Sequence, residues 1–297
     1  MNGIICINKP EGFTSFDVIA KLRGILKMKR IGHSGTLDPM ATGVLPVFLG
    51  NATKACDMLS DNDKSYLADF KLGCTTDTQD STGEVLSTSE IAVSHDEFIK
   101  VMCDFIGEIE QIPPMFSAVS VNGKRLYELA RKGIEIERKS RKIQIDKLEL
   151  REYDNANRTG RLFIECSKGT YVRTIIHDIG QKLGCGGIMT GLVRLSSNGF
   201  TLDGALTLDE VKSLSDENRL EEFILPIEKV FEHLPKLYLD KNQTRLYKNG
   251  VRLDLTRLNG VDKADRYAVY GYDRQFIGTA LAVFDKNELK VEKNFFI

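Results

Sequence analysis

The stretch IGHSGTLDPMATGVLPVFLG, residues 31–50, decides how the amino-terminal part of the chain folds. Small residues and proline exclude a regular helix before residue 44, and the apolar run at 44–49 predicts a buried strand. Gly32, Gly35 and Gly43 permit tight turns and a close approach of the backbone. A polar loop that leads into a buried strand is a common position for functional side chains.

Asp38 lies in the middle of this loop, where Pro39 restricts the backbone that follows it. A carboxylate held in this way can act as a nucleophile or as a base. An aspartate before a proline is more often a turn residue or a helix N-cap. Residue type alone leaves both interpretations open.

The first third of the chain predicts alternating strands and helices. Residues 3–7 predict a buried strand, and a capping box at 14–17 predicts a helix after it. A helix is predicted at 52–59 and a strand at 66–72. The turn-rich stretch TTDTQDSTGE, residues 75–84, is expected to be exposed.

The middle of the chain continues the mixture. A capping box at 94–97 predicts a helix, Asn122-Gly123 predicts a turn, and residues 134–150 predict strand structure. A strand at 162–166 leads into KGTYVRTIIHDIGQKLG, a predicted helix that ends at Gly184. From about residue 235, short strands with aromatic and glycine punctuation predict a separate small β-rich domain.

Composition narrows the class of protein. The 297 residues are 42% hydrophobic and 28% charged, which is typical of a globular protein. Six cysteines without a CxxC pair and four scattered histidines favour free thiols and no metal site. The apolar start GIICI is too short for a signal peptide or a membrane span, so we expect a cytoplasmic protein.

Charge is unevenly distributed along the chain. The formal net charge is −1, but nine Lys or Arg residues face four acidic residues between Lys124 and Lys147. Such a segment can bind phosphates, and it can equally be a solvated charged hairpin.

Three further side chains have two interpretations each. Arg173 and Tyr171 open the helix after KGT, where an arginine can pair with a buried carboxylate or lie on the surface. Tyr66 begins a strand, where tyrosines usually pack, although a ring that faces a pocket can stack on a base.

Five motifs together resemble the bacterial TruB family of tRNA pseudouridine(55) synthases, in the family's order from residue 4 to about residue 200. They are INKPEGFTSFDVI, GHSGTLDPMATGVLP, KSYLADFKLG, PPMFSAVSVNGKRLYELAR and KGTYVRTIIHDIG. The resemblance implies an α+β pseudouridine synthase fold with a mixed, mostly antiparallel central sheet and flanking helices. YKNGVRL and the late strands are similar to a PUA module. The implied domains are a catalytic domain at 1–234, with an RNA-binding insertion at about 117–150, and a PUA-like domain at 235–297.

The implied reaction converts uridine 55 in the tRNA T loop to pseudouridine after the base is flipped out, without a cofactor or a metal. By resemblance, Asp38 is the catalytic aspartate, Arg173 forms an ion pair with it, and Tyr66 stacks on the uracil and assists proton removal from C5. Whether the aspartate attacks C6 or C1′, or a glycal forms, stays open.

The resemblance also implies the substrate-binding residues, which are His33, Tyr171, Leu192, Lys9 and Arg125. The expected partner is tRNA, bound through its T arm and its acceptor end by a monomer. The family usually has lysine where this chain has Ser120, which makes the loop less basic here.

Two other classes of protein remain as alternatives. A tRNA-binding or tRNA-folding factor, with catalysis secondary, would also use the basic segment and the carboxy-terminal module. An aspartyl-phosphate enzyme would use a loop aspartate, but the pattern DxDx[TV] is absent from the sequence.

Overall fold

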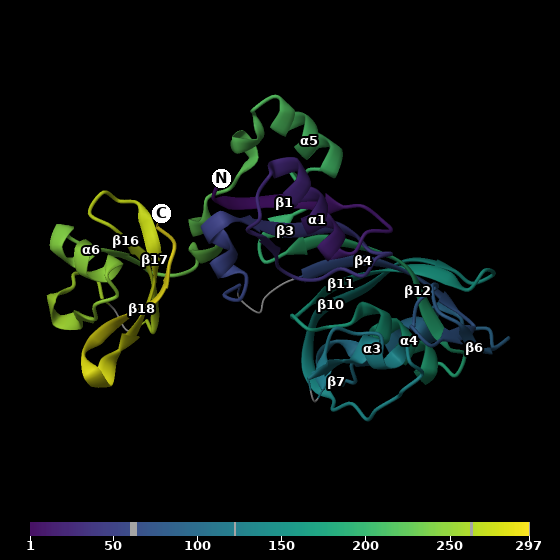
Figure 1. The fold of residues 1–297 in the computed structure, drawn as a ribbon. Helices are drawn as coiled ribbons and strands as arrows, with labels where there is room; N and C mark the ends of the chain where they lie inside the picture. The colour runs from purple at the N-terminus through teal and green to yellow at the C-terminus, as the bar shows by residue number, and fades with distance from the viewer. Residues whose placement is uncertain (60–63, 122, 262–263, 297) are drawn as a thin grey trace.

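The computed structural model describes residues 1–59, 64–121, 123–261 and 264–296. Within these ranges, nine strands form the main sheet, whose principal order is β1-β3-β12-β4-β11-β10-β7, with β2 beside β3 and β13 beside β12 (Figure 1). The strands are β1 (Gly3–Lys9), β2 (Ile31–His33), β3 (Thr42–Leu49), β4 (Lys64–Leu72), β7 (Gly107–Gln111), β10 (Arg141–Asp154), β11 (Thr159–Cys166), β12 (Gly187–Ser197) and β13 (Phe200–Thr201).

The sheet is mixed and mostly antiparallel, as predicted. The pair β3 and β12 is parallel, and the other pairs in this sheet are antiparallel. Strand β12 lies between β3 and β4, so the end of the loop at 34–41 lies beside the centre of the sheet. Because β12 is central, three segments that are distant in sequence lie next to one another: the end of the loop at 34–41, β4 and β12.

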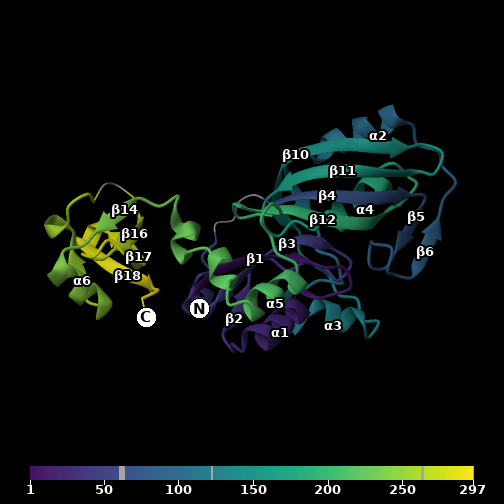
Figure 2. The same cartoon turned by 90° about the horizontal axis from the view of Figure 1, so that it is seen from above.

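Two helical layers bury the apolar side chains of the sheet. Helices α1 (Ser15–Leu26) and α5 (Leu208–Asp216) form one core with β1 and β3. Helices α2 (His95–Met102) and α4 (Val172–Lys182) form a second core with β4, β10 and β11. These three strands lie side by side in Figure 2. The predicted capping boxes at Thr14 and Ser94 are both present.

Two predicted elements are wrong in part. The predicted helix at 52–59 is a 3₁₀ helix, η1 (Gly50–Ala55), which begins at a glycine with φ of 60°. Residues 134–140 form no strand, because the partner β7 ends at Gln111 and is followed by Pro113 and Pro114. Proline has no backbone donor for the ladder, so β10 begins only at Arg141. Asn122 of the predicted turn lies outside the described residues.

The expectation that residues 75–84 are exposed is wrong for most of the segment, although Ser81, Thr82 and Glu84 are exposed. Strands β5 (Cys74–Thr76) and β6 (Val85–Thr88) pair there, and the segment bridges to β12 between Asp80 and Met189. Asp80 is 3% exposed, and its Oδ1 accepts hydrogen bonds from the backbone and side chain of Thr82. Polar side chains that satisfy one another in this way can be buried at low cost.

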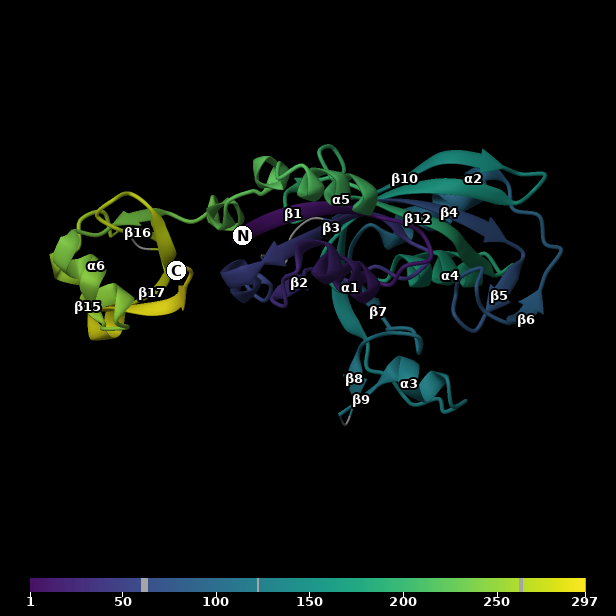
Figure 3. The same ribbon diagram turned by 45° about the horizontal axis from the view of Figure 1, so that its top comes forward.

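A small arm projects from the main body between β7 and β10. It contains β8 (Ser120–Val121), β9 (Lys124–Arg125) and α3 (Leu126–Ala130), and it stands clear of the sheet in Figure 3. This arm includes the first part of the basic segment. Its exposed cations are therefore displayed away from the core.

The carboxy-terminal residues form a second sheet with a core of its own (Figure 1). Its elements are β14 (Lys236–Tyr238), α6 (Lys241–Lys248), β15 (Leu253–Asp254), β16 (Arg266–Tyr270), β17 (Phe276–Val283) and β18 (Glu288–Asn294). Ala268, Tyr270 and Phe295 also pack in a cluster with Phe48 and Phe231, so this unit rests on the main body. Across the described ranges, no helix is both long and apolar enough to span a membrane.

Candidate active site

The loop that carries Asp38 is tethered to the amino-terminal strand and helix. The ammonium group of Lys9 donates hydrogen bonds to the carbonyls of Pro10, Phe13 and Pro39. The Ser15 hydroxyl accepts from the backbone N–H of Leu37 at 2.9 Å. These contacts hold the backbone on both sides of Asp38. Little conformational entropy therefore has to be lost when the carboxylate is placed against a substrate.

Asp38 faces a buried arginine. Nη2 of Arg173 lies 3.5 Å from Oδ2 of Asp38, and Nη1 lies 3.6 Å from Oδ2 of Asp80. Arg173 is 5% exposed, and Nη2 also donates to the carbonyl of Phe116. The ion pair implied by the resemblance is therefore present, and the guanidinium is shared between two carboxylates.

Burial and the neighbouring charges shift the pKa of Asp38 in opposite directions. Burial raises the pKa of the Asp38 carboxyl, and the Arg173 guanidinium opposes that rise. Asp80 raises the pKa further, whereas Lys9 lowers it. Arg173 contacts the Asp38 carboxylate, and 38% of the Asp38 side chain stays exposed to solvent. Such a group can reach a substrate as a nucleophile or a base.

Tyr66 lies in the core beneath the site. It is 6% exposed on β4 and belongs to the same apolar cluster as Leu37 and Leu192. Burial raises the pKa of the Tyr66 phenol to about 12, while the Arg194 guanidinium acts in the opposite direction. The phenol is therefore protonated at neutral pH.

Tyr171 is held through its backbone at the start of α4. The side chain of Gln111 accepts from the Tyr171 N–H at 2.8 Å and donates to the Tyr171 carbonyl at 3.1 Å. The guanidinium carbon of Arg173 lies 5.8 Å from the centre of the Tyr171 ring. The half-buried ring thus lies beside the ion pair.

The structure separates the remaining predicted residues. His33 is half-buried on β2, where burial and the Arg194 charge lower its pKa, so the ring is neutral at neutral pH. Arg125 is exposed on the arm and donates to the Ala118 carbonyl at 3.0 Å. Lys9 is 0% exposed, and burial lowers its pKa to about 8. Its geometry is that of a loop tether, which does not present the ammonium group to a ligand.

Sequence reasoning missed three residues near the site. Asp80 was placed in an exposed turn, whereas it faces Arg173. Gln111 clamps Tyr171 from a strand 60 residues away, and Arg194 contacts the loop from 159 residues away. The dense Thr and Asp spacing around Asp80 is a signal for an internally bonded turn. We find no comparable local signal for the other two.

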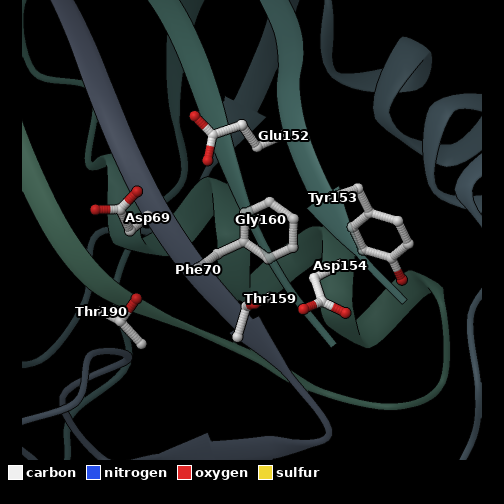
Figure 4. Close-up of a pocket in the computed structure, with 8 residues that line it drawn as sticks. All are labelled: Asp69, Phe70, Glu152, Tyr153, Asp154, Thr159, Gly160 and Thr190. Carbon is white, nitrogen blue, oxygen red and sulfur yellow. The ribbon is translucent and has the colours of Figure 1, made fainter. Parts of the chain in front are cut away.

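A separate hollow of about 350 Å³ lies elsewhere on the sheet (Figure 4). Its lining residues are Asp69, Phe70, Glu152, Tyr153, Asp154, Thr159, Gly160 and Thr190. The predicted site residues all lie in the described part of the chain, and none of them lines it. Asp69 pairs with Arg161 at 2.6 Å, and Asp154 caps a turn at Ala156. The acidic lining disfavours a phosphate backbone there.

Comparison with solved structures defines the class of protein. A chain of a Cbf5-Nop10-Gar1 complex matches with a TM-score of 0.76 and 29% identity, covering 99% of this chain and 85% of that one. A chain of an H/ACA RNP bound to a substrate RNA containing 2′-deoxyuridine matches with a TM-score of 0.75 and 26% identity, over 99% and 85%. The fold and the site define an enzyme with the pseudouridine synthase fold.

Sequence comparison places the chain within that class. Residues 23–172 match the TruB family pseudouridylate synthase N-terminal domain, and residues 173–232 match the tRNA pseudouridylate synthase B C-terminal domain. Proteins named tRNA pseudouridine synthase B from Clostridium kluyveri and Bacillus pumilus are 43% and 41% identical, over 95% and 98% of this chain and 96% and 94% of theirs. The chain belongs to the TruB family of pseudouridylate synthases.

Proposed function

We propose that this protein isomerises uridine 55 in the T loop of tRNA to pseudouridine. The observation that carries the proposal is the Asp38 carboxylate, tethered in its loop and paired with a buried Arg173, in a chain of the TruB family. The relatives named above support tRNA as the substrate.

The reaction is an isomerisation that balances within the nucleotide. The N1–C1′ bond breaks, the uracil turns, and a C5–C1′ bond forms; C5 loses a proton and N1 gains one. Asp38 acts as the anionic group at the reacting nucleotide, with Arg173 supporting its charge. Tyr66 offers an aromatic face for the uracil and assists the removal of the proton from C5. We expect neither a cofactor nor a metal to take part.

The target base must leave the T loop to reach Asp38. Flipping costs a few kcal/mol, and stacking and phosphate contacts offset that cost. Tyr171 and Leu192 line the pocket, and the neutral His33 lies beside the extruded nucleotides. Arg125 and the other cations of the insertion at about 117–150 contact phosphates from the projecting arm. Lys9 contributes by holding the loop.

The carboxy-terminal unit has its own role in this proposal. Residues 235–297 form a PUA-like domain that contacts the acceptor end of tRNA, and residues 1–234 form the catalytic domain. The separate sheet and separate core of the smaller unit support this division. The enzyme works as a cytoplasmic monomer.

The test is a map of pseudouridine in an unmodified tRNA transcript after incubation with the pure protein, without metals or nucleotides. Mass spectrometry after carbodiimide labelling is expected to find one pseudouridine, at position 55. A transcript with cytidine at position 55 is the matched control and is expected to stay unmodified. Product at another position, or none at all, contradicts the proposal.

A tRNA-folding role is a second candidate, favoured by the basic arm that stands clear of the sheet in Figure 3. Folding assistance needs RNA contacts but no carboxylate at the reacting nucleotide. An Asp38→Asn variant that still promotes tRNA folding, while forming no pseudouridine, would assign both roles to the chain.

A further inference from the structure

Arg194 on β12 is the largest fully buried side chain among the described residues. Its Nε donates to the carbonyl of Val44 at 2.7 Å, and its Nη2 donates to the carbonyl of Gly35 at 2.8 Å. These two carbonyls lie on opposite sides of Asp38 in the sequence. One guanidinium therefore joins the two ends of the catalytic loop.

The charge of Arg194 has no carboxylate counterion in the described part of the chain, and its Nη1 is buried without a hydrogen-bond partner. Burying an unpaired cation costs several kcal/mol, so the group is a poor choice for stability alone. The Tyr66 phenol is the ionisable group whose interaction with this guanidinium favours the cation. An expensive buried charge directed at a site residue indicates a functional reason for keeping it.

Strand register explains why the three parts meet. Arg194 is the Cα partner of Tyr66 across β12 and β4, and of Gly43 across β12 and β3. A Cβ at Gly43 would lie 2.2 Å from the Arg194 carbonyl oxygen, and a Cβ at Gly35 would lie 3.0 Å from Nη1. Both glycines also have positive φ. Glycine at positions 35 and 43 therefore allows the loop backbone to approach Arg194 closely.

We propose that Arg194 is a positioning residue, whose buried guanidinium holds the Tyr66 phenol and both ends of the Asp38 loop in one reactive geometry. The inference rests on the proposed function for its kinetic consequence. Arg194 is 0% exposed, so it acts through Tyr66 and the loop and does not touch the RNA. Lysine can keep the charge but cannot span two carbonyls and the phenol with a planar fork.

The experiment compares Arg194→Lys and Arg194→Met with Arg158→Met as the matched control. Arg158 also donates to a distant backbone carbonyl, that of Ser89 at 2.6 Å, but it lies away from the catalytic loop. Each protein is measured for thermal unfolding, tRNA affinity and the single-turnover rate of pseudouridine formation. A 3-fluorotyrosine at position 66 adds a ¹⁹F NMR signal that reports the surroundings of the phenol.

We expect Arg194→Met to lose roughly 100-fold in single-turnover rate, because small misplacements of reacting groups have effects of that order. Its tRNA affinity should stay within about threefold of the parent protein, because the RNA-contacting surface is unchanged. The fluorine resonance should move in Arg194→Met, return part of the way in Arg194→Lys, and stay in place in Arg158→Met.

A rate within about threefold of the parent in both Arg194 variants would overturn the inference, as would an unmoved fluorine resonance. If Arg194→Met fails to fold, Arg194→Lys decides, because it keeps the buried charge and loses the second grip. A parent protein that makes no pseudouridine refutes the proposed function, whereas the fluorine signal still tests the contact between Arg194 and Tyr66.

Discussion

Replacing Arg173 tests the electrostatic support of Asp38, the proposed catalytic carboxylate. At 3.5 Å, the Coulomb attraction between Arg173 and Asp38 is about 5 kcal/mol at an effective dielectric constant of 20. Because 38% of the Asp38 side chain is exposed, solvent screening reduces this to about 2 kcal/mol at the lower end. Arg173→Met is therefore expected to slow pseudouridine formation by roughly 30- to 3,000-fold.

Removing Arg173 should also change the pH dependence of the reaction rate. Burial raises the pKa of Asp38, and Arg173 opposes that rise, so removing the guanidinium leaves the rise unopposed on that side. The reaction needs the ionised carboxylate, and the acid limb of the rate profile should therefore move to higher pH. Arg173→Lys should fall between the parent and Arg173→Met, because an ammonium group cannot grip two carboxylates with a planar fork.

The assay is tritium release from C5 of labelled uridine in tRNA, followed under single-turnover conditions across a range of pH. Arg161→Met is the matched control, because it breaks an arginine–carboxylate pair of 2.6 Å with Asp69 in the separate hollow. A rate for Arg173→Met within about threefold of the parent, with the acid limb in place, would show that Arg173 does not support the charge of Asp38.

Three further variants test neighbouring features. Asp80→Asn removes a carboxylate that shares Arg173 and that raises the pKa of Asp38, so the acid limb of the rate profile should move to lower pH at unchanged tRNA affinity, measured in the same tritium assay; an acid limb that stays in place would contradict this coupling. Gln111→Leu leaves the backbone of Tyr171 without two hydrogen bonds, which should cost about 1–3 kcal/mol in a denaturant titration; no loss of stability would contradict the clamp. Ser120→Lys adds an exposed cation to the arm, so the slope of log affinity against log salt should steepen by about one, and an unchanged slope would place the arm away from the RNA.

Local rules predicted much of the fold. Capping boxes at Thr14 and Ser94 identified two helices, because the signal and the structure lie within four residues of each other. The apolar run after the Asp38 loop identified β3 for the same reason. The boundary of β10 was missed because it depends on a partner strand that ends before Pro113, about 30 residues earlier in the chain.

The candidate site also contains residues that local sequence predicts and residues that it does not. The loop around Asp38 was recognisable from its own residues, but residue types favoured a turn over a catalytic role until the family motifs were considered. Asp80, Gln111 and Arg194 act through contacts that span 60 to 159 residues or cross from another segment, and no local pattern encodes such contacts. The buried cation at Arg194 is visible only once strand register is known.

The most direct measurement of the central claim is the yield of pseudouridine at position 55 with Asp38→Asn. Asparagine keeps nearly the same shape and removes the negative charge, so tRNA affinity should change by less than about threefold. We expect no detectable product after long incubation, with the folded state and tRNA binding intact. Continued turnover by the folded variant would contradict the assignment of Asp38 as the catalytic carboxylate.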